Sequence, residues 1–230
     1  MCGICGVWYF DSERSADEAT MRAMSERLEH RGPDGDGLRC AGSVGFGFRR
    51  LKVIDPEGSA QPITSEDGRV WLVCNGEIYN YQSLRRMLAE RHSFATDGDA
   101  EVIAHLYEDF GTGCVHHLRG MFAFALWDER AQQMTLAVDR FGKKPLYYWL
   151  DGEKIVFGSE IKALLAFPGL PREVDSDALD EYLDPALDES RREWVRRQQL
   201  PDMVDSLANA FIRSAKDRLL TPEQLRSLLD

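Results

Sequence analysis

Residues 70–80 read Val-Trp-Leu-Val-Cys-Asn-Gly-Glu-Ile-Tyr-Asn, and this stretch passes from a strand to a helix. Residues 70–73 are apolar and rich in strand-forming side chains, which predicts a buried strand. Asn80 can cap a helix over residues 82–92, whose apolar side chains share one face. Because a helix follows, the Asn-Gly pair inside the stretch need not form a hairpin turn.

Runs of strands and runs of helices extend on both sides of this stretch. Upstream, Ser15 begins a capping box that opens a first helix, and residues 43–73 carry strand patterns with an Asp-Gly turn. Downstream, residues 102–110 have an amphipathic helical pattern, and four strands follow within residues 121–158. Such separate runs predict an α+β fold of antiparallel sheets with helices packed outside.

Composition excludes several classes of protein. The 230 residues are 43% hydrophobic and 29% charged, which is typical of a globular chain and not of a disordered or collagen-like one. The formal net charge of −11 disfavours nucleic acid and anionic membranes as partners. No apolar run reaches bilayer length, and the N-terminus lacks the pattern of a secretion signal. With five cysteines, an odd number, we expect reduced thiols and a cytoplasmic location.

Residues 184–230 differ in composition from the preceding residues. They carry mixed charge, no glycine and an apolar stripe at helical spacing. We expect a short helical extension after a boundary near residue 183, which covers the domain's own apolar surface or docks on another protein. A phosphate-binding loop needs glycines that let the backbone approach the phosphate. We therefore expect no ATP site in this segment.

Cys2 is the most informative single residue. Removal of Met1, which is expected before a small side chain, would place a thiol nucleophile beside a free α-amine with a pKa suited to proton transfer near neutrality. The alternative is a buried thiol without chemistry. Cys2 and Cys5 also form a C-x-x-C pair, which suggests a redox dithiol or half of a zinc site. No second pair or histidine completes that ligand spacing, so we expect no metal.

Asn75 and Gly76 form a second candidate site. A side-chain amide beside a glycine N–H offers two donors for a developing oxyanion. The alternative is an ordinary turn followed by the helix cap at Asn80.

Seven short motifs follow one another along the chain. They are Met1-Cys2-Gly3-Ile4-Cys5-Gly6, His30-Arg31-Gly32-Pro33-Asp34, Arg50-Leu51, Asn75-Gly76-Glu77-Ile78-Tyr79-Asn80, Gly120-Met121-Phe122-Ala123-Phe124-Ala125, Asp139-Arg140-Phe141-Gly142 and Ser159-Glu160-Ile161-Lys162-Ala163-Leu164. In this order they resemble the N-terminal glutaminase domain of glutamine-hydrolysing asparagine synthetases, and the resemblance covers about residues 1–183.

The resemblance implies a four-layer αββα sandwich of the N-terminal-nucleophile (Ntn) hydrolase type and a class II glutamine amidotransferase activity. Cys2 would attack the glutamine amide to form a γ-glutamyl thioester, and Asn75 and Gly76 would hold the oxyanion. The substrate-binding residues it implies are Arg50 for the α-carboxylate and Glu77 with Asp99 for the α-ammonium.

We also expect specific roles for residues near these site residues. Arg49, beside Arg50, is expected to be a solvated charge. Asp99 could instead cap the helix that follows it. Gly98 departs from the serine common in the family and is expected to loosen the loop. The segment at residues 30–34 is expected to shape a loop over the site.

The resemblance also implies what receives the ammonia. In the family, the acceptor is aspartate activated by ATP on a synthetase domain, so ATP and Mg²⁺ are expected only there, and no cofactor is expected in this chain. That domain has no counterpart after residue 183, so we expect either a truncated relative of the synthetases or a stand-alone module that donates ammonia to a partner chain. A homo-oligomer is left open. The alternative function is a non-catalytic glutamine-binding or regulatory module that retains the fold.

Overall fold

The computed structural model describes residues 1–55, 57–172 and 213–214. Residues 1–168 and 209–230 form one compact unit and residues 169–208 another, of which only residues 169–172 are described. All the elements below belong to the first unit. None of the helices in the described part of the chain is both long and apolar enough to cross a bilayer.

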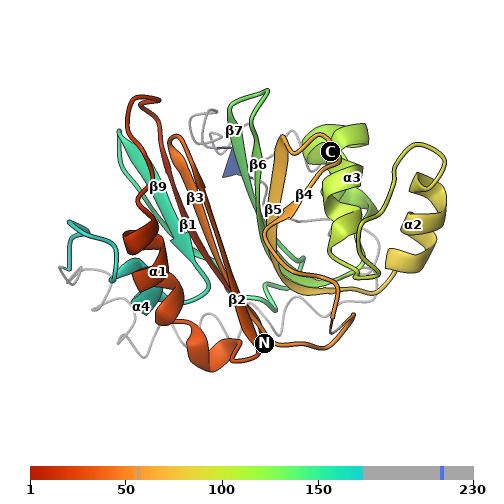
Figure 1. The fold of residues 1–230 in the computed structure, drawn as a ribbon, viewed down its shortest axis with the longest axis horizontal. Helices are drawn as coiled ribbons and strands as arrows, with labels where there is room; N and C mark the ends of the chain where they lie inside the picture. Colours follow the sequence, from red (N-terminus) through yellow and green to blue (C-terminus); the bar gives the residue numbers. More distant parts are fainter. Residues whose placement is uncertain (56, 173–212, 215–230) are drawn as a thin grey trace, which may run out of the picture. The chain divides into compact units, whose positions relative to one another are not determined.

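The unit is built on two antiparallel sheets that face each other (Figure 1). The first sheet has the strand order β2-β3-β1-β9-β8, and the second has the order β10-β7-β6-β5-β4. The strands of the first sheet are β1 (Gly3–Tyr9), β2 (Gly35–Ala41), β3 (Val44–Arg50), β8 (Tyr147–Leu150) and β9 (Lys154–Gly158). Those of the second are β4 (Ile63–Thr64), β5 (Val70–Ile78), β6 (Gly120–Asp128), β7 (Gln133–Val138) and β10 (Arg213–Ser214).

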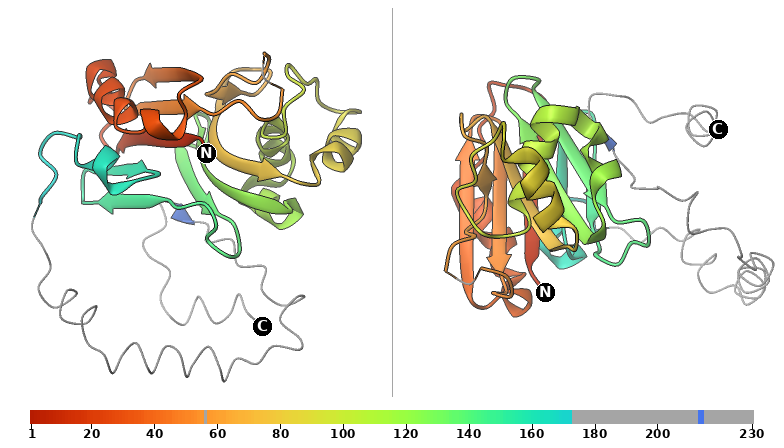
Figure 2. Two further views of the ribbon diagram at one scale, coloured as in Figure 1. Left: turned by 90° about the horizontal axis from the view of Figure 1, so that it is seen from below. Right: turned by 90° about the vertical axis from the view of Figure 1, so that its right-hand side faces the viewer.

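Helices cover the outer faces of both sheets. Helix α1 packs on β1, β3 and α4 outside the first sheet, and α3 packs on β5 and α2 outside the second. Figure 2 shows the same layers from below and from the side. The helices are α1 (Glu18–Glu26), α2 (Tyr81–Leu88), α3 (Glu101–Phe110), α4 (Ile161–Leu164) and the 3₁₀ turns η1 (Glu29–Arg31) and η2 (Gly111–His117). The structure confirms the α+β fold and the αββα order of layers.

Two apolar cores follow from the alternation of side chains along each strand. On β5, Trp71 and Val73 pack between the sheets, whereas Leu72 and Cys74 pack under α2 and α3. On β1 and β3, even-numbered residues such as Ile4 and Phe46 enter the core between the sheets. Because strand side chains alternate with a period of two, residue parity decides which core a side chain reaches.

Two helix caps differ from the sequence prediction. Asp17, and not Ser15, caps α1, because Asp17 stands directly before the helix with an extended backbone and its Oδ2 accepts a hydrogen bond from Thr20 N at 2.8 Å. Asn80 is at the cap position of α2, but its side chain makes no capping hydrogen bond. Instead, its amide bridges His117 O and Arg119 N, each at 2.9 Å, and so ties the start of α2 to the entry of β6.

The expected helical extension lies almost entirely outside the described residues, as does the boundary near residue 183. The exception is β10, where Arg213 and Ser214 pair with Leu136 and Thr135 of β7. These two residues are extended, and the rest of the predicted helical segment lies outside the described residues, so the helices stay a prediction. The outer edge of β7 offers unpaired backbone groups, and a short extended segment satisfies them regardless of its weak strand propensity.

Candidate functional site

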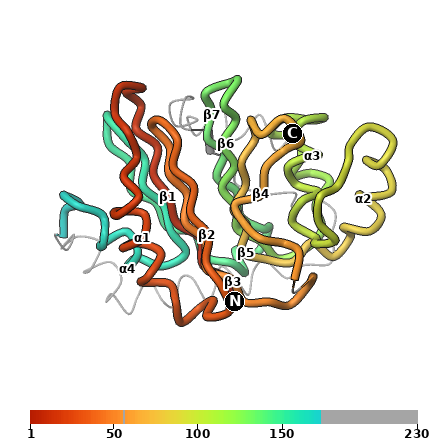
Figure 3. Tube along the Cα trace, viewed as in Figure 1, coloured from red at the N-terminus to blue at the C-terminus, as the bar shows by residue number. Residues whose placement is uncertain are grey.

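Strand parity brings four of the predicted site residues to the space between the sheets. Cys2 packs against the core between the sheets at the start of β1. Arg50 continues the inward series of even-numbered residues at the end of β3, and Asn75 and Glu77 continue the inward series of odd-numbered residues on β5. The N-terminus lies at the end of the sandwich where β5 leaves toward α2 (Figure 3). The end of this space is therefore the candidate active site.

The Cys2 thiol is held by the residue that follows β3. Its Sγ accepts a hydrogen bond from Leu51 N at 3.3 Å and lies 3.6 Å from Leu51 O. Burial raises the pKa of the Cys2 thiol, while the Leu51 hydrogen bond, the N-terminal ammonium and the Arg50 charge act in the opposite direction. Met1 precedes Cys2 and is 54% exposed. The Cys2 nitrogen is therefore a peptide amide here, and removal of the accessible Met1 would turn it into an amine.

Asn75 presents an unused donor on the inner face of β5. The residue is 1% exposed, and its Nδ2 has no hydrogen-bond partner among the described residues. A buried donor left unpaired costs about 1–3 kcal/mol, and a ligand oxygen that accepts from it would remove that cost. At Gly76, a Cβ would lie 2.3 Å from Met121 O, so only glycine fits against β6. Asn75 thus supplies a side-chain donor, and Gly76 supplies a backbone without a side chain that a ligand can approach closely, as an oxyanion site requires.

The two predicted ammonium-binding carboxylates lie close together. Asp99 Oδ2 accepts a hydrogen bond from Ile78 N at 2.7 Å, which places Asp99 at the end of β5 beside Glu77. The cap position of α3 is Ala100, so the alternative of Asp99 as its helix cap is wrong. Burial raises the pKa of Asp99, the Ile78 hydrogen bond opposes this, and the charge of Glu77 adds to the increase. Two neighbouring carboxylates in a half-buried place favour a cationic ligand group.

The two adjacent arginines point to opposite faces of the first sheet. Arg50 Nη2 donates to Asp55 O at 2.5 Å in the loop after β3, and its charge acts on the Cys2 thiol. Arg49 donates through Nε to Ser25 Oγ at 3.2 Å on α1. The expectation of a solvated Arg49 is therefore wrong: as an odd-numbered residue on β3, it faces the helix layer and ties α1 to the sheet.

The loop that carries Asp99 is tightly held, contrary to the loosening expected from Gly98. Gly98 is buried, and a Cβ there would lie 1.9 Å from Ser59 Oγ. Ser59 Oγ donates to Asp55 Oδ2 at 2.7 Å, and Asp97 N donates to the same oxygen at 3.1 Å. Asp55 thus links the loop that receives Arg50 to the loop that ends in Asp99. Glycine at position 98 leaves room for that link.

Replacing Gly98 by alanine is expected to lower the free energy of unfolding by about 1–3 kcal/mol, because the new Cβ displaces a hydrogen-bonded Ser59. The KM for glutamine, the substrate that the sequence analysis predicts, should rise more than kcat falls, since the change displaces Asp99 and not Cys2. The Ser59→Gly exchange should restore part of both losses in the double variant. Urea unfolding and steady-state kinetics on the four proteins test this. If the losses of the two single variants simply add in the double variant, crowding of Ser59 is not the reason why Gly98→Ala is destabilised.

Arg31, which the sequence analysis placed only in a loop over the site, contacts Cys2, the predicted nucleophile, directly. Its Nε donates to Cys2 O at 2.9 Å, and its Nη1 donates to Glu160 Oε1 at 2.9 Å. The Arg31 side chain is 8% exposed. Arg31 is therefore a positioning residue for Cys2, and the motifs at residues 30–34 and 159–164 are joined by this ion pair. The sequence showed each of these two motifs separately, but it gave no indication that they contact each other.

The Glu160→Gln variant is expected to be less stable at neutral pH by about 2 kcal/mol, because it leaves the Arg31 guanidinium without its anion. Burial acts to raise the pKa of Glu160, but hydrogen bonds from Arg31, His30 and Lys162 outweigh it and lower the pKa from 4.5 to about 2. A carboxylate with a lowered folded-state pKa stabilises the fold above its unfolded pKa, and this stabilisation is lost as the pH falls to the folded pKa. The difference should therefore shrink between pH 4.5 and pH 2.

Denaturant unfolding at a series of pH values measures that difference. Glu153→Gln is the matched control, because Glu153 pairs with Arg14 at 3.0 Å while both side chains are exposed to solvent. The control should lose little stability at any pH. An equal loss in both variants, or a loss in Glu160→Gln that does not change with pH, would contradict the assignment.

The C-x-x-C alternative does not fit the structure. Cys2 packs against the core between the sheets, whereas the buried Cys5 lies on the opposite face of the sheet, where its Sγ approaches Gly47. Residues three apart on a strand point to opposite faces, so the two thiols cannot bind one metal ion or pair with each other. Cys5 and Cys74 are core thiols, as expected, and burial raises the pKa of both.

Comparison with known proteins gives a consistent result from sequence and structure. The family described as "Glutamine amidotransferase domain" matches residues 1–207. Asparagine synthetase [glutamine-hydrolyzing] 2 of Bacillus subtilis is 42% identical over 176 residues, which cover 75% of this chain and 23% of that protein. Asparagine synthetase [glutamine-hydrolyzing] 2 of Arabidopsis thaliana is 38% identical over 235 residues, which cover 96% of this chain and 39% of that protein. The chain thus spans well under half the length of these relatives.

A solved structure carries the same fold. Glutamine phosphoribosylpyrophosphate amidotransferase from B. subtilis superposes with a TM-score of 0.59 over 72% of this chain and 43% of that one. The sequence identity is 23%, so the likeness concerns the fold alone.

Proposed function

Because the chain belongs to the glutamine amidotransferase domain family, we propose that it hydrolyses the side-chain amide of glutamine through a Cys2 thioester and supplies the ammonia to an acceptor held elsewhere. The observation that supports this most is the buried Asn75 amide, which lacks a partner among the described residues and lies on the same inner space as the Cys2 thiol. An active-site donor aimed at a developing charge is expected to be unpaired before substrate binds.

The first half of the reaction forms the thioester. Once Met1 is removed, the Cys2 Sγ attacks the Cδ atom of glutamine while its proton passes to the Cys2 α-amine. The carbonyl electrons move to the oxygen, which accepts hydrogen bonds from Asn75 Nδ2 and Gly76 N. When the tetrahedral intermediate collapses, the C–N bond breaks and the α-amine returns the proton to the departing ammonia. The products are ammonia and a γ-glutamyl thioester.

The second half regenerates the thiol. A water molecule attacks the thioester carbon and gives a proton to the same α-amine. The oxyanion again accepts from Asn75 and Gly76, and its collapse breaks the C–S bond. The thiolate takes the proton back, and glutamate leaves. One amine thus acts as base and acid in both halves.

The amino-acid end of glutamine distinguishes it from simple amides. The Arg50 guanidinium has five N–H donors, so it can bind the α-carboxylate while it retains Asp55 O. Asp99 and Glu77 bind the α-ammonium. This set explains why a free amino acid, and not a peptide-linked glutamine, is the expected substrate.

The acceptor is proposed from the relatives, whose names include asparagine synthetase. We expect aspartate, activated by ATP and Mg²⁺ on a synthetase part that lies outside residues 1–183 or on a partner chain. Binding of ATP by the purified chain at an affinity useful for catalysis would contradict this division of labour.

Glutamate release from glutamine, measured without ATP or aspartate and with the N-terminal mass determined on the same sample, tests the proposal. Turnover by protein that lacks Met1 is the expected result. Absence of turnover with a free Cys2, together with saturable glutamine binding, would favour the non-catalytic binding module instead.

A further inference from the structure

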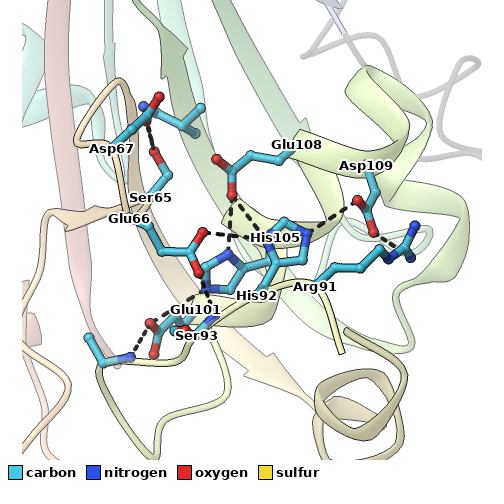
Figure 4. A network of polar contacts seen from close by, with 12 residues as sticks. Ser65, Glu66, Asp67, Arg91, His92, Ser93, Glu101, His105, Glu108 and Asp109 are labelled. Carbon is cyan, nitrogen blue, oxygen red and sulfur yellow. Dashed lines mark hydrogen bonds and ion pairs between the residues drawn. The ribbon is translucent and has the colours of Figure 1, made fainter. Parts of the chain in front are cut away.

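A second cluster of reactive side chains lies on the outer side of the second sheet. Glu66 is in the turn between β4 and β5, His92 follows α2, and His105 and Glu108 are on α3 (Figure 4). Each offers one ligand atom, and the four atoms lie within 4.8 Å of one another. We propose that these four residues bind a divalent transition-metal ion, with Zn²⁺ as the reference ion.

Three of the distances between ligand atoms are close to those of a tetrahedral site, and the remaining ones do not exceed 4.8 Å. His92 Nδ1 lies 3.6 Å from Glu66 Oε2 and 3.5 Å from Glu108 Oε2. His105 Nδ1 lies 3.1 Å from the same Glu108 oxygen. In a tetrahedral zinc site with bonds of about 2.0–2.1 Å, neighbouring ligand atoms are roughly 3.3 Å apart. An ion can therefore bind with small side-chain movements.

The unpartnered nitrogen of His92 points to a missing ligand. The His92 side chain is 9% exposed, and its Nδ1 has no hydrogen-bond partner among the described residues. This nitrogen is aimed at the two carboxylates, Glu66 and Glu108, at distances too long for a hydrogen bond. A cation placed between the three atoms would give this nitrogen the partner that it lacks and would contact both carboxylates.

A carboxylate lies behind each histidine, and one of the two is within hydrogen-bond distance. Asp109 Oδ1 lies 3.2 Å from His92 Nε2, whereas Glu101 Oε1 lies 3.6 Å from His105 Nε2, which has no hydrogen-bond partner among the described residues. A metal-binding imidazole commonly donates its other N–H to a carboxylate, which fixes the tautomer and turns the lone pair toward the ion. Both histidines here have Nε2 toward an outer carboxylate and Nδ1 toward Glu108.

The charge of the cluster also favours a cation. The four carboxylates are Glu66, Glu101, Glu108 and Asp109, and the only guanidinium paired with any of them in the described residues is that of Arg91, 2.7 Å from Asp109. Glu66, Glu101 and Glu108 have no Lys or Arg partner among the described residues, so their carboxylates would attract a divalent cation.

The ion would join three segments that are distant in sequence. Glu66 accepts from Ser93 N, and Glu101 accepts from Ala95 N at 2.7 Å and Thr96 N at 2.8 Å. The cluster thus holds the loop that leads to Asp99. Since all four positions are filled by protein atoms, the site would be structural, and the exposed Glu66 gives the ion access from solvent.

Metal titration of the full chain after treatment with EDTA tests the proposal without reference to glutamine. Isothermal titration with Zn²⁺ should give one ion per chain and a higher melting temperature. Co²⁺ should give visible d–d absorption without a thiolate charge-transfer band, which distinguishes nitrogen and oxygen ligands from the cysteines. Glu108→Gln keeps the side-chain shape, and Glu66→Gln changes an exposed residue, so neither should prevent folding.

Each of these two variants should weaken Zn²⁺ binding by more than about 100-fold, since loss of a supporting outer group alone costs 10–100-fold. His116→Gln is the matched control, because His116 is exposed and outside the cluster. It should bind Zn²⁺ like the unchanged chain. Failure to bind Zn²⁺, equal affinity in Glu108→Gln and the unchanged chain, or a thiolate band with Co²⁺ would each overturn the proposal.

Discussion

Replacing Cys2 by alanine should reduce glutamate release from glutamine by at least about 10⁴-fold, because no other group near the site can form the thioester. The other described cysteines do not share the position. Cys5 faces α1, Cys74 lies under the helices of the second sheet, and Cys114 is buried in the same outer core. The rate of glutamate release with saturating glutamine, measured on protein without Met1, gives the result.

Two further observations make this test decisive. The melting temperature of Cys2→Ala should stay close to that of the unchanged chain, because the thiol is half-buried and its hydrogen bonds are two weak ones to the Leu51 backbone, from N at 3.3 Å and to O at 3.6 Å. Cys40→Ala is the matched control: Cys40 is also half-buried but lies on β2, away from the core between the sheets. It should retain full activity. Normal turnover by Cys2→Ala would refute the nucleophile assignment.

Replacing Asn75 by alanine should lower kcat by about 10²–10³-fold while KM for glutamine changes little. Removing one donor from an oxyanion site costs about 3–4 kcal/mol in the transition state, and the ground-state carbonyl does not gain from that donor equally. The fold should tolerate the change, since Nδ2 gives up no hydrogen bond to any described residue. Steady-state kinetics and thermal unfolding of the same preparation measure both effects.

A matched control for Asn75 is available in the same sheet. Thr135 on β7 is also fully buried, and its Oγ1 also has no hydrogen-bond partner among the described residues. Thr135→Val removes that unpaired group with little change of shape and should leave kcat unchanged. If Asn75→Ala instead raises KM and leaves kcat intact, Asn75 binds the ground state of the substrate and is not an oxyanion donor.

The order of elements could be predicted because it depends on local pattern. Alternating apolar residues predicted β5, β6, β7 and β9, and helical spacing predicted α1, α2 and α3. Strand β2 gave no signal, because Gly35–Ala41 is only half-buried at the edge of its sheet and carries little apolar alternation. Caps were the least predictable detail: Asn80 has the right residue type for a cap, but its amide satisfies more distant backbone groups.

The sequence by itself determined which side chains could do chemistry and, through the period of two along each strand, which face of a sheet each would occupy. The motifs that resemble a known family allowed Cys2, Arg50, Asn75 and Glu77 to be proposed together. Only the tertiary structure decided the contacts between residues distant in the chain: Arg31 with Cys2, Asp99 with Ile78, and His92 with His105. The periodicity of a strand or helix is a local property of the backbone. The pairing of strand ends and loops instead depends on how the layers pack, and no local pattern contains that information.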